Sequence, residues 1–188
     1  MKKTFFLVLL AFVCATDVIA QVKWNTIEQS AKVNSSRNGK LYFVDFYTSW
    51  CGWCKKMDKD TFTDKVVAQI LNTYFVPTKF DAEGDAAFTW NGVEYKGGGV
   101  AAGGRRATHP FAQAVLGAKM GFPSFAIFSS DRTLLTVVPG YNNAADFTVI
   151  LWYFASGDYN KYPFEKYAAI FDVQIRPAME KALGMSAN

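Results

Sequence analysis

Two cysteines separated by two residues follow closely on a compact apolar segment. Residues 41–47 hold six apolar or aromatic side chains and one charged residue, Asp45, a composition typical of a buried central strand. Cys51 and Cys54 come next and are predicted to open a helix that runs through Met57. Side chains three residues apart share one face of a helix, so the two sulfur atoms can form a disulfide bond within its first turn. The segment therefore predicts a strand, a reversible sulfur bond and a helix in direct succession.

Helices and strands alternate along the rest of the chain. The spacing of apolar residues predicts helices over residues 24–37, 64–72 (with Thr63 as the N-cap), 110–116, 144–155 and 164–175. Compact apolar runs predict strands over residues 75–80, 125–128 and 133–138. Interleaved helices and short strands are typical of an α/β fold in which helices cover both faces of one sheet.

A polar, glycine-rich segment at residues 81–108 interrupts this pattern, and we interpret it as an insertion. Its first part has Asn91 and Gly92 between the alternating side chains of residues 88–95, which predicts a tight β-hairpin. The remainder, from Gly97 onward, is expected to be a flexible loop.

The N-terminus has the layout of a secretory signal peptide. Lys2 and Lys3 precede an apolar run at residues 5–13, and smaller residues lead to a cleavage site after Ala20. The apolar run is shorter than the roughly 18 to 20 residues that a membrane-spanning helix needs. We therefore expect cleavage of residues 1–20 and a periplasmic or secreted protein.

The mature chain is expected to be a single domain over residues 21–188, because a chain of 188 residues accommodates one ordinary core. Residues 158–188 should form a C-terminal helical extension. Lipid attachment at Cys14 is an alternative end to the signal segment, but Val13 occupies the position where a small residue is expected. Cleavage lowers the net charge from +4 to +3, too small an excess to predict a nucleic-acid partner.

The cysteine content favours chemistry over structural cross-linking. Signal cleavage would leave Cys51 and Cys54, and a bond that closes so small a loop removes little entropy from the unfolded chain. A zinc site would need two further nitrogen or sulfur ligands, whereas the mature chain offers only His109. We interpret that histidine as a helix-cap or surface residue. We therefore expect no metal and no cofactor.

The two cysteines and Asp45 have separate candidate roles in disulfide exchange. Cys51 lies at the helix N-terminus, where unpaired amides and the helix dipole favour its thiolate, so we expect it to attack. Cys54, one turn further on and less exposed, would resolve the mixed disulfide. Asp45 either faces solvent at a strand end or lies beneath the cysteines with a raised pKa, exchanging a proton with Cys54.

Residues 44–55 resemble the active-site segment of thioredoxins, because Asp45, Trp50 and both cysteines fall in the same register. Further along, the Gly-Phe-Pro-Ser sequence at residues 121–124 resembles the cis-proline loop of that family. The resemblance covers about residues 41–155. It implies a thioredoxin fold, with a central mixed sheet flanked by helices, an insertion before the helix that leads to the cis-proline, and an extra C-terminal helix.

The resemblance also implies roles for individual residues. It favours a buried, proton-exchanging Asp45, and a cis Pro123 that stands opposite the attacking cysteine and exposes the backbone of Phe122 to a partner strand. Trp53 replaces the proline that cytosolic thioredoxins have between the cysteines, and beside Trp50 it would enlarge an apolar docking surface. The predicted substrate-binding residues are Trp50, Gly52, Trp53, Phe122 and Pro123.

The segment from Trp50 to Met57, with Phe62 downstream, is similar to the periplasmic thioredoxin-like domains of bacterial transmembrane thiol:disulfide interchange reductases and their stand-alone relatives. This resemblance implies an exported protein-disulfide reductase or interchange enzyme. Its partners would be the thiols and disulfides of cell-envelope proteins, with a membrane protein as electron donor. An oxidase or isomerase is an alternative, because Trp53 leaves the direction of electron flow open. A non-catalytic binding module is a second alternative. The retention of both cysteines and Asp45 argues against it.

Overall fold

The computed structural model describes residues 21–33, 39–100, 104 and 106–185. The predicted signal peptide, with the alternative lipid-attachment site at Cys14, lies outside these residues. The α-helices are α1 (Ile27–Lys32), α2 (Gly52–Asp60), α3 (Lys65–Tyr74), α4 (Pro110–Leu116), α5 (Ala144–Ala155), α6 (Phe164–Ile170) and α7 (Arg176–Ala182). The strands are β1 (Leu41–Tyr47), β2 (Phe75–Asp81), β3 (Phe88–Trp90), β4 (Val93–Tyr95), β5 (Ser124–Phe128) and β6 (Leu134–Pro139). Two 3-10 turns, η2 (Gly117–Lys119) and η3 (Asp158–Asn160), and a π-helical turn, η4 (Phe171–Ile175), are also present. None of the described helices is long and apolar enough to cross a membrane.

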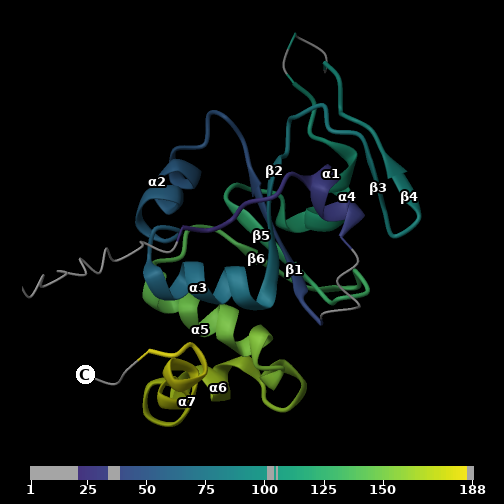
Figure 1. Cartoon of the computed structure of the whole chain (residues 1–188). Helices are drawn as coiled ribbons and strands as arrows, with labels where there is room; N and C mark the ends of the chain where they lie inside the picture. Colours follow the sequence, from purple (N-terminus) through teal and green to yellow (C-terminus); the bar gives the residue numbers. More distant parts are fainter. Residues whose placement is uncertain (1–20, 34–38, 101–103, 105, 186–188) are drawn as a thin grey trace, which may run out of the picture.

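Strands β1, β2, β5 and β6 form one mixed sheet in the order β2-β1-β5-β6 (Figure 1). β1 and β2 run parallel, whereas β5 is antiparallel to β1 and β6 is antiparallel to β5. The chain passes through α2 and α3 between β1 and β2, as a parallel connection requires. The predicted α/β fold with a central mixed sheet is therefore confirmed.

Helices cover both faces of the sheet, because side chains along β1 alternate between two cores. Phe43 belongs to the core that it shares with α2, α3 and α5. Val44 and Phe46 belong to the opposite core, which they share with α1, α4 and β3. Asp45 alternates with these two residues and therefore faces the same side as Phe43, toward α2.

The first helix, α1, is shorter than the predicted residues 24–37. Thr26 is its N-cap and accepts a hydrogen bond from the backbone of Gln29, which fixes the start of the helix after Trp24. Residues 34–37 of the predicted helix lie outside the described ranges.

The N-cap of α3 is Asp64 rather than the predicted Thr63. The Asp64 carboxylate accepts hydrogen bonds from the backbone N–H groups of Val66 (2.9 Å) and Val67 (3.0 Å). A carboxylate is also stabilised by the positive end of the helix dipole. The Thr63 hydroxyl instead donates to the carbonyl of Lys59.

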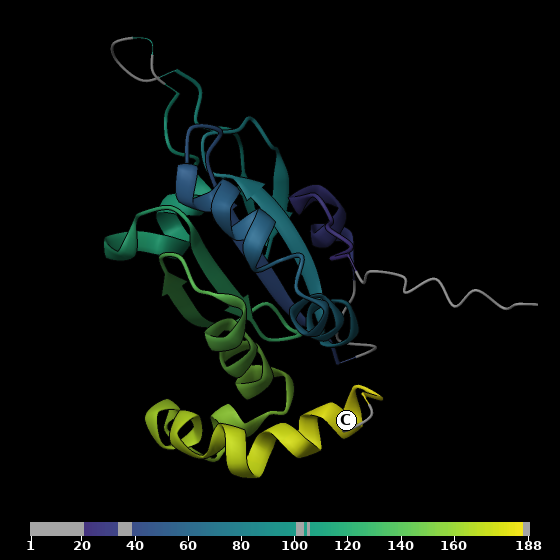
Figure 2. The ribbon, with the colours of Figure 1, turned by 90° about the vertical axis from the view of Figure 1, so that its left-hand side faces the viewer.

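The helix predicted over residues 164–175 is interrupted, because the π-helical turn η4 separates α6 from α7. Pro177 accounts for the break, since its missing N–H and its ring prevent a regular α-helical turn over the preceding residues. The C-terminal segment packs against α5 and is joined to α3 by a hydrogen bond from the Gln69 amide to the Leu183 carbonyl. Figure 2 shows it, in yellow, at the end of the molecule away from the insertion.

The inserted segment contains the predicted hairpin. β3 and β4 are antiparallel, and Asn91 and Gly92 between them have φ angles of 53° and 79°, as a tight two-residue turn requires. Further along, a Cβ on Gly97 would lie 2.5 Å from the Cα of Asp85, so glycine allows close backbone packing there. The hairpin runs along the side of the molecule (Figure 1), and its turn reaches the end of the sheet opposite the start of α2, where the Asn91 side chain donates a hydrogen bond to the Arg132 carbonyl.

Candidate redox site

The predicted cysteine pair forms a disulfide bond at the start of α2. Cys51 and Cys54 are joined, with their Cα atoms 5.3 Å apart. Cys51 is the N-cap of the helix, and its Sγ accepts a hydrogen bond of 3.0 Å from the backbone N–H of Cys54. After reduction, the same amide and the positive end of the helix dipole would stabilise a thiolate on Cys51.

The two cysteines are equally exposed, although Cys54 was predicted to be less exposed than Cys51. Each is 4% exposed, so the expectation of a more buried Cys54 is wrong for the disulfide form. The bond holds both sulfur atoms within one turn, which makes their burial alike. The difference between them is in the backbone, because Cys51 precedes the helix whereas Cys54 lies in its first turn.

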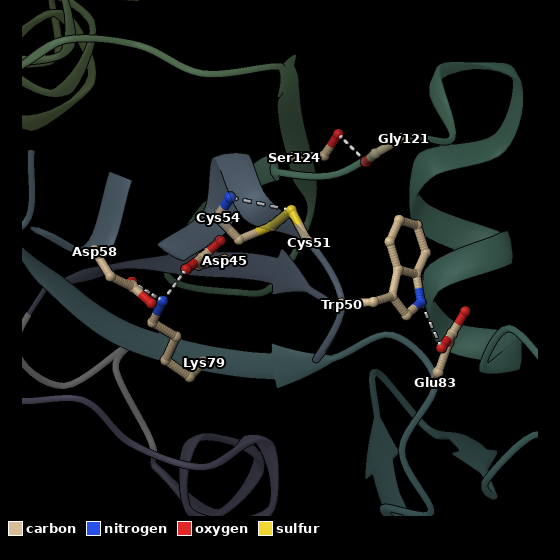
Figure 3. Close-up of a disulfide and its surroundings, with 9 residues drawn as sticks. All are labelled: Asp45, Trp50, Cys51, Cys54, Asp58, Lys79, Glu83, Gly121 and Ser124. Atoms are coloured by element: carbon tan, nitrogen blue, oxygen red, sulfur yellow. Dashed lines mark hydrogen bonds and ion pairs between the residues drawn. A yellow bond between two sulfur atoms is a disulfide. The ribbon is translucent and has the colours of Figure 1, made fainter. Parts of the chain in front are cut away.

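Asp45 is buried and takes part in an ion-pair cluster with α2. It is 1% exposed, so the alternative of a solvent-facing strand end is wrong. Its Oδ2 lies 2.5 Å from the Nζ of Lys79, which also pairs with Asp58 of α2 (Figure 3). Its Oδ1 has no hydrogen-bond partner among the described residues, and Figure 3 shows this oxygen directed toward Cys54. One carboxyl oxygen is therefore engaged, and the other is available on the side of the cysteine pair.

Burial sets the protonation behaviour of Asp45. Desolvation raises the pKa of its carboxyl group from 3.8 to about 6, although the charge of Lys79 and its hydrogen bond lower it. Burial also lowers the pKa of Lys79, but the charges of Asp45 and Asp58 outweigh this effect and leave that pKa above its ordinary value. At neutral pH Lys79 is therefore a cation, while Asp45 titrates close enough to neutrality to accept and release a proton.

Lys79 is a site residue that the sequence reasoning missed. It lies directly opposite Asp45 in the register of β1 and β2, so the two side chains leave the sheet on the same face. Its ammonium group lies 4.9 Å from the ring centre of Trp24 and 5.1 Å from that of Phe62, contacts that suit a partly buried cation. The signal in the sequence is a lysine inside the apolar strand at residues 75–81, but its meaning depends on the strand register.

The loop before β5 carries the predicted proline. The peptide bond between Phe122 and Pro123 is cis, and the Pro123 carbonyl accepts a hydrogen bond of 2.8 Å from the N–H of Gly140. The ring of Phe122 lies 6.2 Å from that of Trp50, which brings this loop to the cysteine motif. Figure 3 shows Ser124, the first residue of β5, near the disulfide.

A family model described as a thioredoxin-like domain matches residues 28–155. This chain belongs to the thioredoxin-like family. Among curated proteins, an uncharacterised protein of Caenorhabditis elegans is 36% identical over 62 residues, a match that spans 33% of this chain and 8% of the worm protein.

Solved structures with a similar fold include a thioredoxin-fold protein from Helicobacter pylori, with a TM-score of 0.53 and 15% identity over 78% of this chain and 86% of that chain. A thioredoxin from Thermus thermophilus has a TM-score of 0.49 and 15% identity over 76% of this chain and 98% of that chain. The oxidised C-terminal domain of DsbD from Neisseria meningitidis has a TM-score of 0.39 and 21% identity over 68% of this chain and 87% of that chain. Family membership and the disulfide at the start of α2 together support thiol:disulfide oxidoreductase chemistry.

Trp50 of this thioredoxin-like protein is exposed but held in one orientation. Its side chain is 65% exposed, and its indole N–H donates a hydrogen bond of 3.0 Å to Oε2 of Glu83 (Figure 3). The guanidinium group of Arg106, from the insertion, donates to the Glu83 carbonyl at 3.4 Å. Glu83 and Arg106 both belong to the insertion at residues 81–108, which therefore supplies the hydrogen bond that orients Trp50.

Trp53 has a different ring partner from Trp50. It is 59% exposed, and its ring centre lies 5.5 Å from that of Tyr141. The ammonium group of Lys56 lies over the same tyrosine ring, 5.4 Å from its centre. Tyr141 is a second residue that the sequence reasoning missed. Gly52, between the two tryptophans, is exposed and has open space where a side chain would stand.

His109 caps a helix, which agrees with one of its two sequence interpretations. It is the N-cap of α4, and its Nδ1 accepts a hydrogen bond of 3.1 Å from the N–H of Phe111. Its Nε2 lies 2.9 Å from the carbonyl oxygen of Ala86, and the residue is fully buried. In the part of the chain that the structure describes, no three His, Cys, Asp or Glu side chains are grouped so that they could hold a metal ion.

Proposed function

We propose that this protein is an exported protein-disulfide reductase that transfers two electrons from its reduced cysteine pair to the disulfides of cell-envelope proteins. The observation that carries the proposal is the bond between Cys51 and Cys54 at the N-terminus of α2, together with the buried carboxyl group of Asp45 on the side of α2.

The first step starts from the reduced pair. The Cys51 thiolate attacks one sulfur of the substrate disulfide, forming a mixed disulfide. The substrate's own S–S bond breaks, and its second sulfur leaves as a thiolate that takes up a proton from water. The N–H of Cys54 and the helix N-terminus favour this step, because they stabilise the thiolate form of Cys51 at neutral pH.

The second step requires deprotonation of Cys54. The Asp45 carboxylate is placed to accept that proton, because its Oδ1 has no other partner in the described structure and its pKa of about 6 makes it a stronger base than an ordinary aspartate. Cys54 then attacks the Sγ of Cys51 and the mixed disulfide breaks. The first substrate sulfur leaves and takes up a proton. The substrate ends as a dithiol and the protein as a disulfide, which a membrane dithiol donor would reduce again.

The residues between the cysteines support the reductive direction. A cation beside the attacking cysteine would stabilise its thiolate and so make the disulfide a stronger oxidant. Gly52 and Trp53 provide no such charge. We therefore expect a cysteine pair that gives up electrons rather than one that takes them.

The test is the reduction potential of residues 21–188, measured by equilibration with glutathione buffers and combined with an assay for reduction of a protein disulfide. We expect a potential more reducing than the glutathione couple, and a more oxidising value would replace the reductase by an oxidase or isomerase. The Cys54→Ala variant should accumulate mixed disulfides at Cys51 with envelope proteins, whereas the double variant Cys51→Ala, Cys54→Ala should accumulate none. Failure of the wild-type chain to reduce an accessible disulfide at any potential would favour the binding module.

A further inference from the structure

Two exposed tryptophans border the buried disulfide, and each has its own aromatic partner. The ring of Trp50 contacts Phe122, and the ring of Trp53 contacts Tyr141. Cys51 is itself 4% exposed. Trp50 and Trp53 are exposed neighbours of Cys51 in the chain, so a substrate polypeptide bound at Cys51 lies next to exposed aromatic rings.

Hydrogen bonds to the residues before and after Tyr141 hold its backbone in place. On one side the Gly140 N–H donates to the Pro123 carbonyl at 2.8 Å, and on the other the Thr61 hydroxyl donates to the Asn142 carbonyl at 2.7 Å. Thr61 is fully buried where α2 ends, so this second contact is anchored in the core. A surface that is already ordered binds its partner without the entropic cost of ordering.

We infer that Trp53 and Tyr141 form a docking surface for a large aromatic side chain next to the reacting cysteine of the substrate. The inference rests on the proposed function, because disulfide exchange is what brings a polypeptide to this surface. Lys56 beside Tyr141 is paired with Asp60, so charge contributes little and ring contact is the main determinant. Large aromatic side chains are mostly buried in folded proteins. The favoured substrates are therefore disulfides in unfolded or partly unfolded chains.

Three substrates test this selectivity with the reduced wild-type protein. Two are peptide disulfides of equal length and charge, with Phe beside each cysteine in one and Ser in the other, and the third is glutathione disulfide. Single-turnover rates are followed by tryptophan fluorescence and divided by the rate of each substrate with dithiothreitol. We expect the Phe peptide to react about threefold to tenfold faster than the Ser peptide, the range that one aromatic contact provides.

The variants separate ring contact from a general structural effect. Tyr141→Ala should remove most of the preference for the Phe peptide. The preference is a ratio of two rates in the same variant, so any change in that variant's reduction potential cancels. Tyr141→Phe should keep the preference, since it keeps the ring. Tyr162→Ala, an exposed tyrosine of the C-terminal segment, is the matched control and should keep it too.

Equal corrected rates for the two peptides in the wild type, or an unchanged preference in Tyr141→Ala, would overturn the inference and leave the proposed function intact. A protein that reduced none of the three substrates would overturn the proposed function itself.

Discussion

Replacement of Asp45 by Asn should stabilise the oxidised protein at neutral pH and have little effect near pH 4. Asn has the shape of the protonated carboxyl group but cannot ionise. The pKa of the Asp45 carboxyl group is about 6 in the folded protein, whereas its ordinary value is 3.8. The difference is about two pKa units, and each unit corresponds to about 1.4 kcal/mol of folding free energy. Below pH 4 the group is protonated in both states. Between about pH 4 and 6 only the unfolded chain ionises, so wild-type stability falls as pH rises, and above pH 6 the loss is complete. At pH 8 the variant should therefore gain on the order of 3 kcal/mol.

Urea unfolding at pH 4, 6 and 8, followed by tryptophan fluorescence, measures this gain. A change of that size would also raise the melting temperature by about 6 to 12 °C. Asp60→Asn is the matched control, because it makes the same substitution in α2, where a hydrogen bond from Lys56 lowers the carboxyl pKa. That variant should lose a little stability at pH 8 rather than gain it. An equal gain at pH 4 and pH 8 for Asp45→Asn, or none at either, would refute the view that burial of a charge governs this residue.

Three further predictions concern the same site and the insertion. Asp45→Asn should slow resolution by Cys54 about 100-fold at pH 7 and leave the first attack nearly unchanged; rapid acid quenching of the mixed disulfide measures both steps, and equal slowing of the two would count against a role in resolution. Lys79→Met removes a cation that lowers the pKa of Asp45, so the pH at which resolution reaches half its maximal rate should rise. Stopped-flow rates between pH 5 and 9 check this, and an unmoved profile would separate Lys79 from the proton transfer. Gly97→Ala should lower the free energy of unfolding by about 1 to 3 kcal/mol, because its Cβ would lie 2.5 Å from the Cα of Asp85. An unchanged urea midpoint would mean that the backbone of the insertion shifts to accommodate the added methyl group.

Local patterns made the redox motif and its surroundings predictable. The strand before Cys51, the helix after it and the turn at Asn91 and Gly92 each depend on neighbouring residues, and the structure contains all three. Helix ends were less predictable, because adjacent residues compete for the capping position. Asp64 rather than Thr63 caps α3 because a carboxylate accepts two backbone hydrogen bonds there.

Residues that act across the fold could not be assigned from the sequence. Lys79 is 34 positions from Asp45 along the chain, and their pairing exists only because β1 and β2 align in one parallel register. Tyr141 follows the last strand and reaches Trp53 because two hydrogen bonds hold its loop against the cis-proline loop and the end of α2. Neither position belongs to a local motif, and the one local signal, a lysine inside the apolar strand at residues 75–81, does not identify its partner.

In the proposed mechanism, Asp45 is useful because two opposing effects leave its pKa near neutrality. Desolvation without a cation would hold the carboxyl group protonated, and it could not act as a base for Cys54. A dedicated cation would hold it ionised, and it could not release its proton in a usable pH range. Lys79 is shared with Asp58, whose side chain is 48% exposed, and the pKa of Asp45 remains at about 6. The carboxyl group is then mostly ionised at pH 7 and still exchanges its proton readily. The ion pairs between β1, β2 and α2 therefore belong to the chemistry that Cys54 requires, as well as to the packing of the helix on the sheet.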